Sequence, residues 1–464
     1  MPRPPAATLA DLLALLREGE PVPAGVLTEQ LGISRPVLAR LITEAGNQVL
    51  RIGNARATSY VARATSNSNA WPLFRMRADT TLDELGTLHA LRGDRFHFQP
   101  AGERPNLMRP VETTRGHFPG LPWFLDDLRP QGFLGRTLAH RMSRELGVPE
   151  DLARWQTRHI LTAIVHGGTG IGDLLLGQPA IDRALAELDT PIDAVPAAQR
   201  PRRYPAWAQE ALAGEETGSS PGGEQPKFTA TVDTGHGRYA ALVKFAPHDE
   251  GQASRRWAEL LACEHLALSC LRETGCNAAE SELIEADGHT FLEVRRFDRA
   301  PDTLGRRGFV SLLALDAAFI GDGPRDWGVA GEQLLAQRWI ERGTADDMAR
   351  LHWFGRLIGN SDMHLGNLGF HLGDAGPLPM CPAYDMLPMY LAPSRTGIVR
   401  PASPLQLAAP ARGGQLPHIA WAADAALCFW RAVADSDRIT SPELNQLARE
   451  NHAVVETFAR RFAG

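Results

Sequence analysis

The first 65 residues alternate apolar and polar positions in a way that predicts three helices and a hairpin. Apolar side chains recur at helical spacing over residues 9–16, 22–31 and 35–45, and Gly32 opens the short turn before the third segment. Residues 48–61 then read as a β-hairpin that turns at Gly53 and Asn54. Helices joined by a glycine-containing turn and followed by a hairpin are typical of a winged helix-turn-helix domain.

This segment, residues 1–65, carries seven arginines against five acidic residues. The excess falls on the third helix and the hairpin, where a domain of this kind contacts DNA phosphates. The DNA contacts that we expect come from Ser34, Arg35 and Arg40 on the helix and from Arg51, Asn54 and Arg56 on the hairpin. Small helical domains without a DNA function are common, so the residues alone leave that alternative open.

The remaining pattern predicts an α+β chain with four further segments. These are an α/β subdomain over residues 70–190, a Pro/Ala-rich connector over 191–216 with one short helix at 206–213, a nucleotide-binding lobe over 217–300, and a helical lobe over 301–464. The first contains a strand-like run at 95–98 and a mainly helical stretch over 120–188. The third reads as a hairpin of residues 228–233 and 238–245, a helix over 255–271 and a strand over 290–299.

Composition limits the class of protein. With 464 residues, 44% hydrophobic and 22% charged, the chain resembles a soluble globular protein of two to four domains. The net charge of −6 gives no global basic field for nucleic acid. The five cysteines form no C-x-x-C pair, so we expect reduced thiols and no zinc site. No targeting signal or apolar run of about 18 residues is present, so we expect a cytoplasmic protein that does not span a membrane.

Lysine is rare in this chain. Among 48 Lys+Arg residues only Lys227 and Lys244 are lysines. Lys227 ends a glycine- and serine-rich loop that contains Gly222, Gly223 and Gln225, and Lys244 closes a strand-like run. A glycine loop whose amides approach phosphates, with a strand lysine beside it, is what a kinase-type nucleotide site needs. A helix glutamate pairs with that lysine in protein kinases, and the helix after Lys244 offers Glu259 and Glu264, of which we favour Glu264. The alternative is that the placement of the two lysines is a coincidence.

A second candidate motif is the sequence Asn-Ser-Asp-Met-His-Leu-Gly-Asn over residues 360–367, with Asp385 further along the chain. Kinase-type phosphoryl transfer uses an Asp that orients the acceptor hydroxyl, an Asn five residues later on Mg²⁺, and a later metal-binding Asp. Asp362, Asn367 and Asp385 have this spacing. Taken alone, Asp and Asn in a loop more often make turn hydrogen bonds. A second glycine-rich run, residues 166–172, has no lysine and is interpreted as a structural turn.

Four motifs in this order resemble the HipA family of toxin serine/threonine kinases. Residues 220–227 resemble its Ser-x-x-Gly-x-Gln-x-Lys loop, 296–299 its Arg-Phe-Asp-Arg signature, 360–367 its Asn-x-Asp-x-His-x-x-Asn loop, and 383–385 its metal-binding Asp. Residues 121–130 are also similar to the family's N-terminal subdomain. The resemblance covers residues 70–464 and implies a bilobal protein-kinase-like (HipA-like) fold behind the winged helix-turn-helix domain.

The resemblance implies a role for each matching residue. Asp362 is then the catalytic base, Asn367 and Asp385 hold Mg²⁺, Lys244 contacts the ATP phosphates, and His364 touches the γ-phosphate. Gly222, Gly223, Gln225, Lys227, Asp298 and main-chain groups of Arg295 and Phe297 complete the ATP site. Ser220, or alternatively Ser219, is the expected autophosphorylation site, because a dianion there competes with the ATP phosphates.

One departure bears on the partners. HipA-family toxins usually depend on a separate helix-turn-helix antitoxin, whereas this chain carries such a domain itself, as in the YjjJ-like subgroup. The expected activity is transfer of the ATP γ-phosphate to a protein hydroxyl, with an aminoacyl-tRNA synthetase or another translation component as substrate. Further candidate partners are a separate antitoxin and a second copy of the chain. The alternatives are a transcription regulator whose kinase-like body senses a nucleotide or partner without catalysis, and a small-molecule or lipid kinase.

Overall fold

The computed structural model describes residues 7–65, 69–102, 116–168, 170–191, 193–213, 225–246, 251–323, 326–394, 396–410 and 413–462. The chain forms two compact units. The first unit comprises Met1–Arg75, Asp83–Asp126 and Leu174–Ile181, and the second comprises Met76–Leu82, Asp127–Asp173 and Asp182–Gly464.

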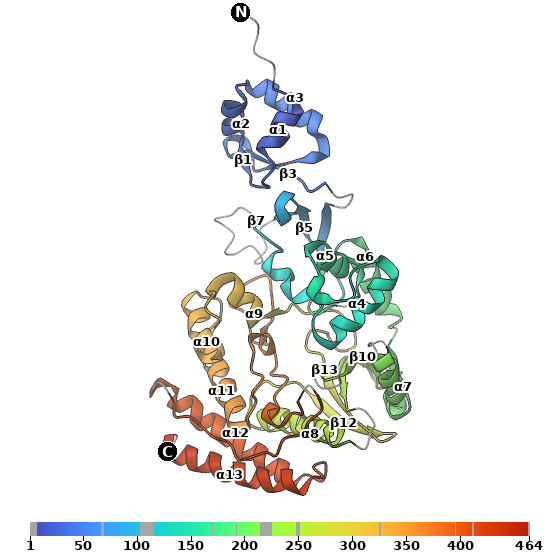
Figure 1. Cartoon of the computed structure of the whole chain (residues 1–464), viewed down its shortest axis with the longest axis vertical. Coiled ribbons are helices and arrows are strands. Elements are labelled where there is room, and N and C mark those ends of the chain that lie inside the picture. The colour runs from blue at the N-terminus through green and yellow to red at the C-terminus, as the bar shows by residue number, and fades with distance from the viewer. Residues whose placement is uncertain are drawn as a thin grey trace, which may run out of the picture. The chain divides into compact units, whose positions relative to one another are not determined.

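The first unit begins with three helices and a small sheet (Figure 1). The elements are α1 (Leu9–Leu15), β1 (Val22–Pro23), α2 (Ala24–Leu31), α3 (Arg35–Ala45), β2 (Val49–Ile52) and β3 (Ser59–Ala62), and the strand order is β1-β3-β2. Reciprocal hydrogen bonds between Thr8 and Asp11 cap α1, and Gly32 ends α2 in the left-handed conformation at φ 61°. Leucines from all three helices form the core, among them Leu12, Leu27 and Leu38. The predicted helices and hairpin are confirmed.

A five-stranded antiparallel sheet completes the first unit. Its strands are β4 (Ala70–Met76), β5 (Leu82–Ala90), β6 (Phe96–Pro100), β7 (His117–Phe118) and β8 (Leu174–Leu176), in the order β7-β6-β5-β4-β8. Leu91, just after β5, packs against Leu50 and Val61 of the hairpin, so the hairpin and the sheet share buried apolar surface. The helices α4 (Gly132–Leu146) and α5 (Thr157–His166) of the second unit, and α6 (Gln178–Asp189), which runs from the first unit into the second, confirm the predicted helical stretch.

The second unit contains another five-stranded sheet with a helix on each face. Its strands are β9 (Ala194–Pro196), β10 (Lys227–Asp233), β11 (Arg238–Phe245), β12 (Ser281–Ala286) and β13 (His289–Arg295), in the order β12-β13-β11-β10-β9. Because side chains alternate along a strand, Phe228 and Val243 lie on one face, where they pack with Tyr204 of α7 (Arg200–Ala213). The other face carries Lys244, whose ammonium group contacts Glu264 of α8 (Gln252–Glu273).

Residues 194–213 are more ordered than the composition predicts. We expected one short helix at 206–213 in this stretch, but α7 begins at Arg200, and β9 pairs in parallel with β10. Proline is tolerated in a first helical turn, so Pro201 does not delay the start of α7. Tyr204 then packs edge-on against Phe228 and Phe291, with ring centroids 5.3 and 5.6 Å away. Burial of this aromatic side chain against the sheet outweighs the local proline content.

The rest of the second unit is helical, as predicted. It contains β14 (Val310–Ser311), α9 (Leu312–Leu315), α10 (Trp327–Ala336), α11 (Arg342–Ile358), β15 (Gly369–Phe370), α12 (Leu416–Asp435) and α13 (Pro442–Phe462). The last two helices lie side by side, and α11 lies beside α12 (Figure 1). Trp353, Phe429 and Trp430 fill the core between them. In the described part of the chain no helix is long and apolar enough to cross a membrane.

Candidate functional site

The two lysines of the chain lie directly opposite each other. Lys227 begins β10, and its cross-strand partner in β11 is Lys244. Directly paired residues of an antiparallel sheet point to the same face, and like charges in such a pair destabilise the sheet. The pair therefore needs anionic partners, supplied by the protein, by a ligand or by both.

Lys244 has two carboxylate partners within the protein. Its Nζ donates to Oε1 and Oε2 of Glu264 at 2.7 and 2.8 Å and also to Oδ1 of Asp385. The preference for Glu264 over Glu259 is confirmed, since Glu259 accepts from the Ser441 N–H at 2.7 Å instead. Burial by itself lowers the pKa of Lys244, but Asp385 and Glu264 outweigh burial and hold that pKa above its usual range. Lys244 is therefore an ammonium ion at neutral pH.

The backbone of Asp385 has an unusual conformation and is hydrogen-bonded to Asn360. It adopts a left-handed conformation with φ 53°, and its carbonyl accepts from Nδ2 of Asn360 at 3.1 Å. Burial raises the pKa of its carboxyl, but the neighbouring Lys244 and Lys227 ammonium groups keep the pKa below the usual range. The side chain is still 33% exposed, so an ionised carboxylate is accessible beside two lysines.

The loop of Asp362 begins where α11 ends. Gly359 stops the helix at φ 74°, and the Asn360 side chain then accepts from the Asp362 N–H at 3.1 Å. Nδ2 of Asn367 donates to the Asp362 carbonyl at 2.8 Å, which closes the loop. The Asp362 side chain is exposed, and among the described residues its carboxylate has no hydrogen-bond or ionic partner. An exposed carboxylate on a fixed backbone suits a group that accepts a proton.

His364 and Tyr384 stiffen the same region. Nδ1 of His364 accepts from the Gly366 N–H at 3.0 Å, so the ring is turned back onto its own loop. The hydroxyl of Tyr384 donates to the Gly366 carbonyl at 2.9 Å, and its ring stacks on Phe297 with centroids 5.5 Å apart. Tyr384 thus connects the Asp362 loop to the segment after β13.

The glycine-rich loop is only partly described. Gly222, Gly223, Ser219 and Ser220 lie outside the described residues. Gln225 donates through Nε2 to the Phe245 carbonyl, and its Oε1 is buried without a partner among the described groups. Two opposed lysines suit the negative charge of a polyphosphate, whereas the unpartnered Gln225 oxygen requires a donor and not a phosphate oxygen. The hard oxygen donors of Asp385 and Asn367 suit Mg²⁺.

The end of β13 and the two residues after it differ in the use of their main-chain N–H groups. The Arg295 N–H already donates to the Glu280 carbonyl at 2.8 Å, and the Arg296 N–H to the Ala240 carbonyl at 2.9 Å. In contrast, the Phe297 N–H has no hydrogen-bond partner in the described part of the chain. Of these three N–H groups, only that of Phe297 is left to donate to an adenine base. The main-chain group that Arg295 could still offer to adenine is its carbonyl.

The Asp298 carboxylate has its partners within the protein. We expected Asp298 in the nucleotide site, and its buried carboxylate accepts from Arg296 at 2.7 and 2.9 Å, from Arg299 at 2.7 Å and from the Gly172 N–H at 2.9 Å. Arg296 and Arg299 also donate to the Gly170 carbonyl. Burial opposes ionisation of Asp298, yet the two guanidinium groups lower its pKa well below the usual range. The charged residues of this signature therefore anchor the glycine run at 166–172, whose interpretation as a structural turn is confirmed.

Comparison with known proteins places the chain in a family. The family description "YjjJ-like toxin, middle domain" matches residues 67–185, and "HipA-like C-terminal domain" matches residues 219–458. Toxin YjjJ of Escherichia coli (strain K12) is 37% identical over 401 residues, which cover 85% of this chain and 86% of that protein. The chain belongs to the HipA-like family and to its YjjJ-like toxins.

Two solved structures resemble this YjjJ-like chain. HipA of Shewanella oneidensis MR-1, from a complex with HipB and operator DNA, has 14% identity and a TM-score of 0.49, over 84% of this chain and 97% of that one. The proinflammatory kinase CtkA of Helicobacter pylori has 13% identity and a TM-score of 0.36, over 52% of this chain and 89% of that one.

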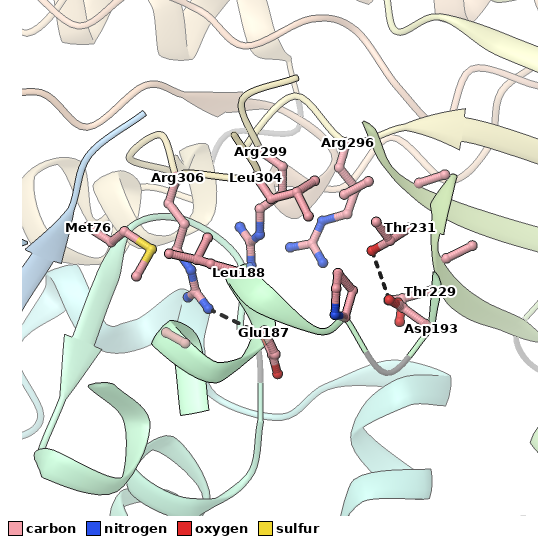
Figure 2. A pocket seen from close by; sticks show the side chains of 15 residues that line it. Met76, Glu187, Leu188, Asp193, Thr229, Thr231, Arg296, Arg299, Leu304 and Arg306 are labelled. Carbon is pink, nitrogen blue, oxygen red and sulfur yellow. Dashed lines mark hydrogen bonds and ion pairs between the residues drawn. The ribbon is translucent and has the colours of Figure 1, made fainter. Parts of the chain in front are cut away.

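One cavity of this YjjJ-like toxin is separate from the predicted lysines and aspartates of the site. It has a volume of about 80 Å³. It is lined by residues 229–231 of β10, residues 240–241 of β11 and charged side chains that include Arg296, Arg299, Arg306, Glu187 and Asp193 (Figure 2). Its lining residue Ala240 is four positions from Lys244 along β11, roughly 13 Å away at strand spacing. Lys227, Lys244, Asp362 and Asp385 do not line it.

Sequence reasoning assigned no role to Asn360 and Tyr384, although both lie within the matched motifs. Asn360 is 7% exposed and bonds to the backbone on both sides of the site, at Asp362 and at Asp385. The position of Asn360, two residues before Asp362, could have indicated its role. An Asn amide can both donate and accept, so it can join two backbone segments.

The residues predicted to contact DNA lie on one helix and the hairpin. Ser34, Arg35 and Arg40 are exposed at the start and along the middle of α3. Arg51 of β2 is exposed and donates to the Thr58 hydroxyl at 3.4 Å, and Asn54 is exposed in the turn. The Arg56 side chain lies outside the described residues.

Proposed function

We propose that this YjjJ-like toxin is an ATP- and Mg²⁺-dependent serine/threonine protein kinase. The observation that supports the proposal most is the contact of one ammonium group, that of Lys244, with Glu264 and Asp385. These residues lie 20 and 141 positions away in the sequence. A strand lysine, a helix glutamate and a metal-binding aspartate form this constellation in protein kinases.

Each residue then has a task in phosphoryl transfer. Lys244 and Lys227 bind phosphate oxygens, and Asn367 and Asp385 hold Mg²⁺ through their side-chain oxygens. Mg²⁺ when bound neutralises charge on the phosphates. Asp362 orients the acceptor hydroxyl and receives its proton, while Asn360 keeps the Asp362 and Asp385 backbones in a fixed relation. The protein supplies positioning and charge stabilisation rather than covalent chemistry.

The partners follow from the same proposal. The acceptor is a protein hydroxyl, with translation components such as an aminoacyl-tRNA synthetase as the first class to examine. Residues 1–65 act as a winged helix-turn-helix that binds DNA, and phosphorylation at Ser220 or Ser219 silences the kinase by competing with ATP. A HipB-like antitoxin or a second copy of the chain is a further candidate partner.

The test is incubation of the purified full chain with γ-labelled ATP and Mg²⁺, followed by detection of labelled protein. The wild type and Ser361→Ala, which changes the exposed neighbour of Asp362, should both be labelled. Asp362→Asn should lower labelling by at least about 10²-fold, the usual contribution of a general base, with an unchanged melting temperature. Unlabelled wild-type protein that still binds ATP and DNA would instead identify a nucleotide-sensing regulator.

A further inference from the structure

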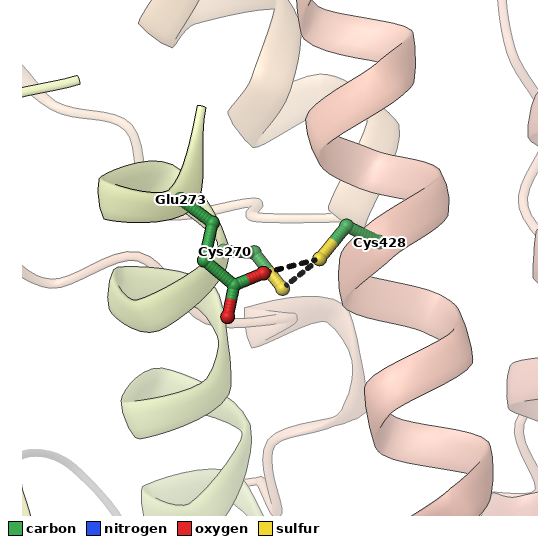
Figure 3. A group of neighbouring side chains, drawn as sticks. All are labelled: Cys270, Glu273 and Cys428. Carbon is green, nitrogen blue, oxygen red and sulfur yellow. Dashed lines mark hydrogen bonds between the residues drawn. The ribbon is translucent and has the colours of Figure 1, made fainter. Parts of the chain in front are cut away.

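Two cysteines far apart in the sequence face each other in the second unit. Cys270 lies near the end of α8 and Cys428 in the middle of α12, and their Sγ atoms are 2.6 Å apart. Oε2 of Glu273, one helical turn after Cys270, lies 3.5 Å from the Cys428 sulfur (Figure 3). The two helices pack along each other, so this proximity comes from the fold and not from neighbouring sequence.

The other three cysteines are placed differently. Cys263 and Cys381 are buried, Cys276 is half-buried, and none of them contacts a second sulfur within the residues that the structure describes. Cys270 is only 3% exposed, whereas Cys428 is half-buried. The pair thus has the arrangement of an entry thiol with a second thiol behind it.

We propose that Cys270 and Cys428 form a dithiol site that low-molecular-weight disulfides oxidise to a reversible intramolecular disulfide. Cys428, after losing its proton, attacks one sulfur of the small disulfide and releases one thiol. Cys270 then loses its proton and attacks the Cys428 sulfur, which releases the second thiol. The protein loses two protons and two electrons, and the small disulfide gains both to become two thiols.

The geometry favours this bond over a metal ion. The same three side chains could offer ligand atoms to a cation. However, thiolates that share a tetrahedral zinc ion at about 2.3 Å each lie roughly 3.8 Å apart, so metal binding would require the two sulfurs to separate by more than about 1 Å. A disulfide bond is about 2.05 Å long, so forming it needs the two sulfurs to approach by only about 0.5 Å.

The environment keeps the pair reduced until an oxidant arrives. Burial raises the pKa of the Cys428 thiol, and the adjacent Glu273 carboxylate raises it further against the opposing effect of Cys270. Burial raises the pKa of Cys270 as well. Both groups are therefore protonated thiols at neutral pH, and Oε2 of Glu273 accepts from the Cys428 thiol.

The bond would anchor the helix that carries Glu264. Cys270 follows Glu264 by six residues on α8, and the new bond would fix this helix to α12. Any effect on phosphoryl transfer rests on the proposed function, whereas bond formation itself does not, so the experiment measures the bond.

The purified full chain is incubated with oxidised glutathione, quenched with an alkylating agent and mapped by mass spectrometry without reduction. We expect a Cys270–Cys428 cross-linked peptide and a fall in denatured-state thiols from five to three. We also expect a higher melting temperature that dithiothreitol reverses, because the bond closes a long loop. Cys276→Ser, which alters another half-buried thiol, should give the same result.

Cys428→Ser and, independently, Cys270→Ala should abolish the cross-link and the shift in melting temperature. A glutathione adduct that stays on Cys428 without reaching Cys270 would overturn the proposal, as would cross-linking through Cys276. Stoichiometric zinc in the purified protein that disappears in Cys428→Ser would overturn it too, in favour of a metal site.

Discussion

The Lys244 ammonium group is balanced by two carboxylates, those of Glu264 and Asp385, and water is largely excluded from Lys244 and Glu264. Lys244 and Glu264 have side chains only 7% and 1% exposed. Removing one member of a buried ion pair leaves an uncompensated charge, whereas replacing both members by apolar groups is often nearly neutral. Burial raises the pKa of Glu264 and Lys244 lowers it, so Glu264 depends on its partner for ionisation.

Lys244→Met should therefore destabilise the second unit by about 3–5 kcal/mol, the usual cost of breaking a buried pair. The double variant Lys244→Met/Glu264→Leu should recover much of this loss, which urea unfolding would measure. Arg342→Met breaks the exposed Arg342–Glu332 pair and should leave the midpoint unchanged. Equal losses in the single and double variants would show that the Lys244–Glu264 pair is not the origin of the effect.

Asn360 acts through the two aspartates and not on a substrate. Asn360→Ala removes the hydrogen bonds to the Asp362 N–H and the Asp385 carbonyl. Because misplacement of reacting groups by about 1 Å costs up to 10²-fold, kcat should fall roughly 10–100-fold with a much smaller change in the KM for ATP. Steady-state kinetics measures this split, with Ser361→Ala as the control. A KM effect alone would contradict a positioning role.

Strands β5 and β6 carry a pair of histidines that makes this sheet sensitive to acid. His89 and His97 are cross-strand partners, and their rings stack with centroids 6.4 Å apart. Burial, with Arg63 nearby, lowers the pKa of His89 to about 4, and burial, with His89 and His117 nearby, lowers the pKa of His97 to about 4. Both rings are therefore neutral at pH 7.

The pKa values of His89 and His97 in the folded protein lie below the value of about 6.5 in the unfolded chain. Between pH 4 and about 6.5 the unfolded chain therefore binds more protons than the folded protein. The stability from both histidines is complete above pH ~6.5 and is lost as pH falls toward 4. Hydrogen exchange of β5 and β6 peptides, corrected for intrinsic rates, should show lower protection at pH 5 than at pH 7. His97→Gln should reduce this difference, and the exposed His236→Gln should not. If His97→Gln showed the same pH effect as the wild type, His97 would not be the origin of the acid sensitivity.

Local periodicity was sufficient for most elements. The helices of residues 9–45, the hairpin β10–β11 and helix α8 follow from alternating or 3.6-residue patterns, which depend on nearby residues alone. The early start of α7 was missed, because its stability comes from Tyr204 packing on strands that follow later in the chain. Long-range packing of this kind overrides local propensity and leaves no local signal.

The site was predictable where chemistry restricts the residue type. Lysine at two positions only, together with the Asp-x-x-x-x-Asn spacing, indicated groups that the fold brings together at Lys244 and Asp385. The sequence did not indicate that the Asp298 carboxylate pairs with Arg296 and Arg299, because this pairing is visible only in the three-dimensional contacts. The Cys270–Cys428 contact gave no sequence signal, because it joins helices 158 residues apart.

At the scale of the whole molecule, the expected activities fall in different compact units. The predicted DNA-contacting residues belong to the first unit, and Lys244, Asp362 and Asp385 belong to the second. Arg35 and Arg40 are exposed, so replacing them removes positive charge without opening the core formed by Leu38 and Leu41. The proposal therefore predicts that the two activities can be separated by mutation.

Arg35→Gln/Arg40→Gln should weaken binding to DNA from upstream of the protein's own gene at every salt concentration, while ATP-dependent labelling stays at the wild-type level. Each lost phosphate contact reduces the slope of log K against log salt by about 0.9, so the double variant should lose roughly two units. Fluorescence anisotropy across a salt series measures this slope. Arg17→Gln, an exposed arginine outside α3, is the control and should keep the wild-type slope. Wild-type DNA affinity in the double variant would show that α3 is not the DNA-contacting helix. Weaker DNA binding together with a loss of labelling would show that the two units are coupled.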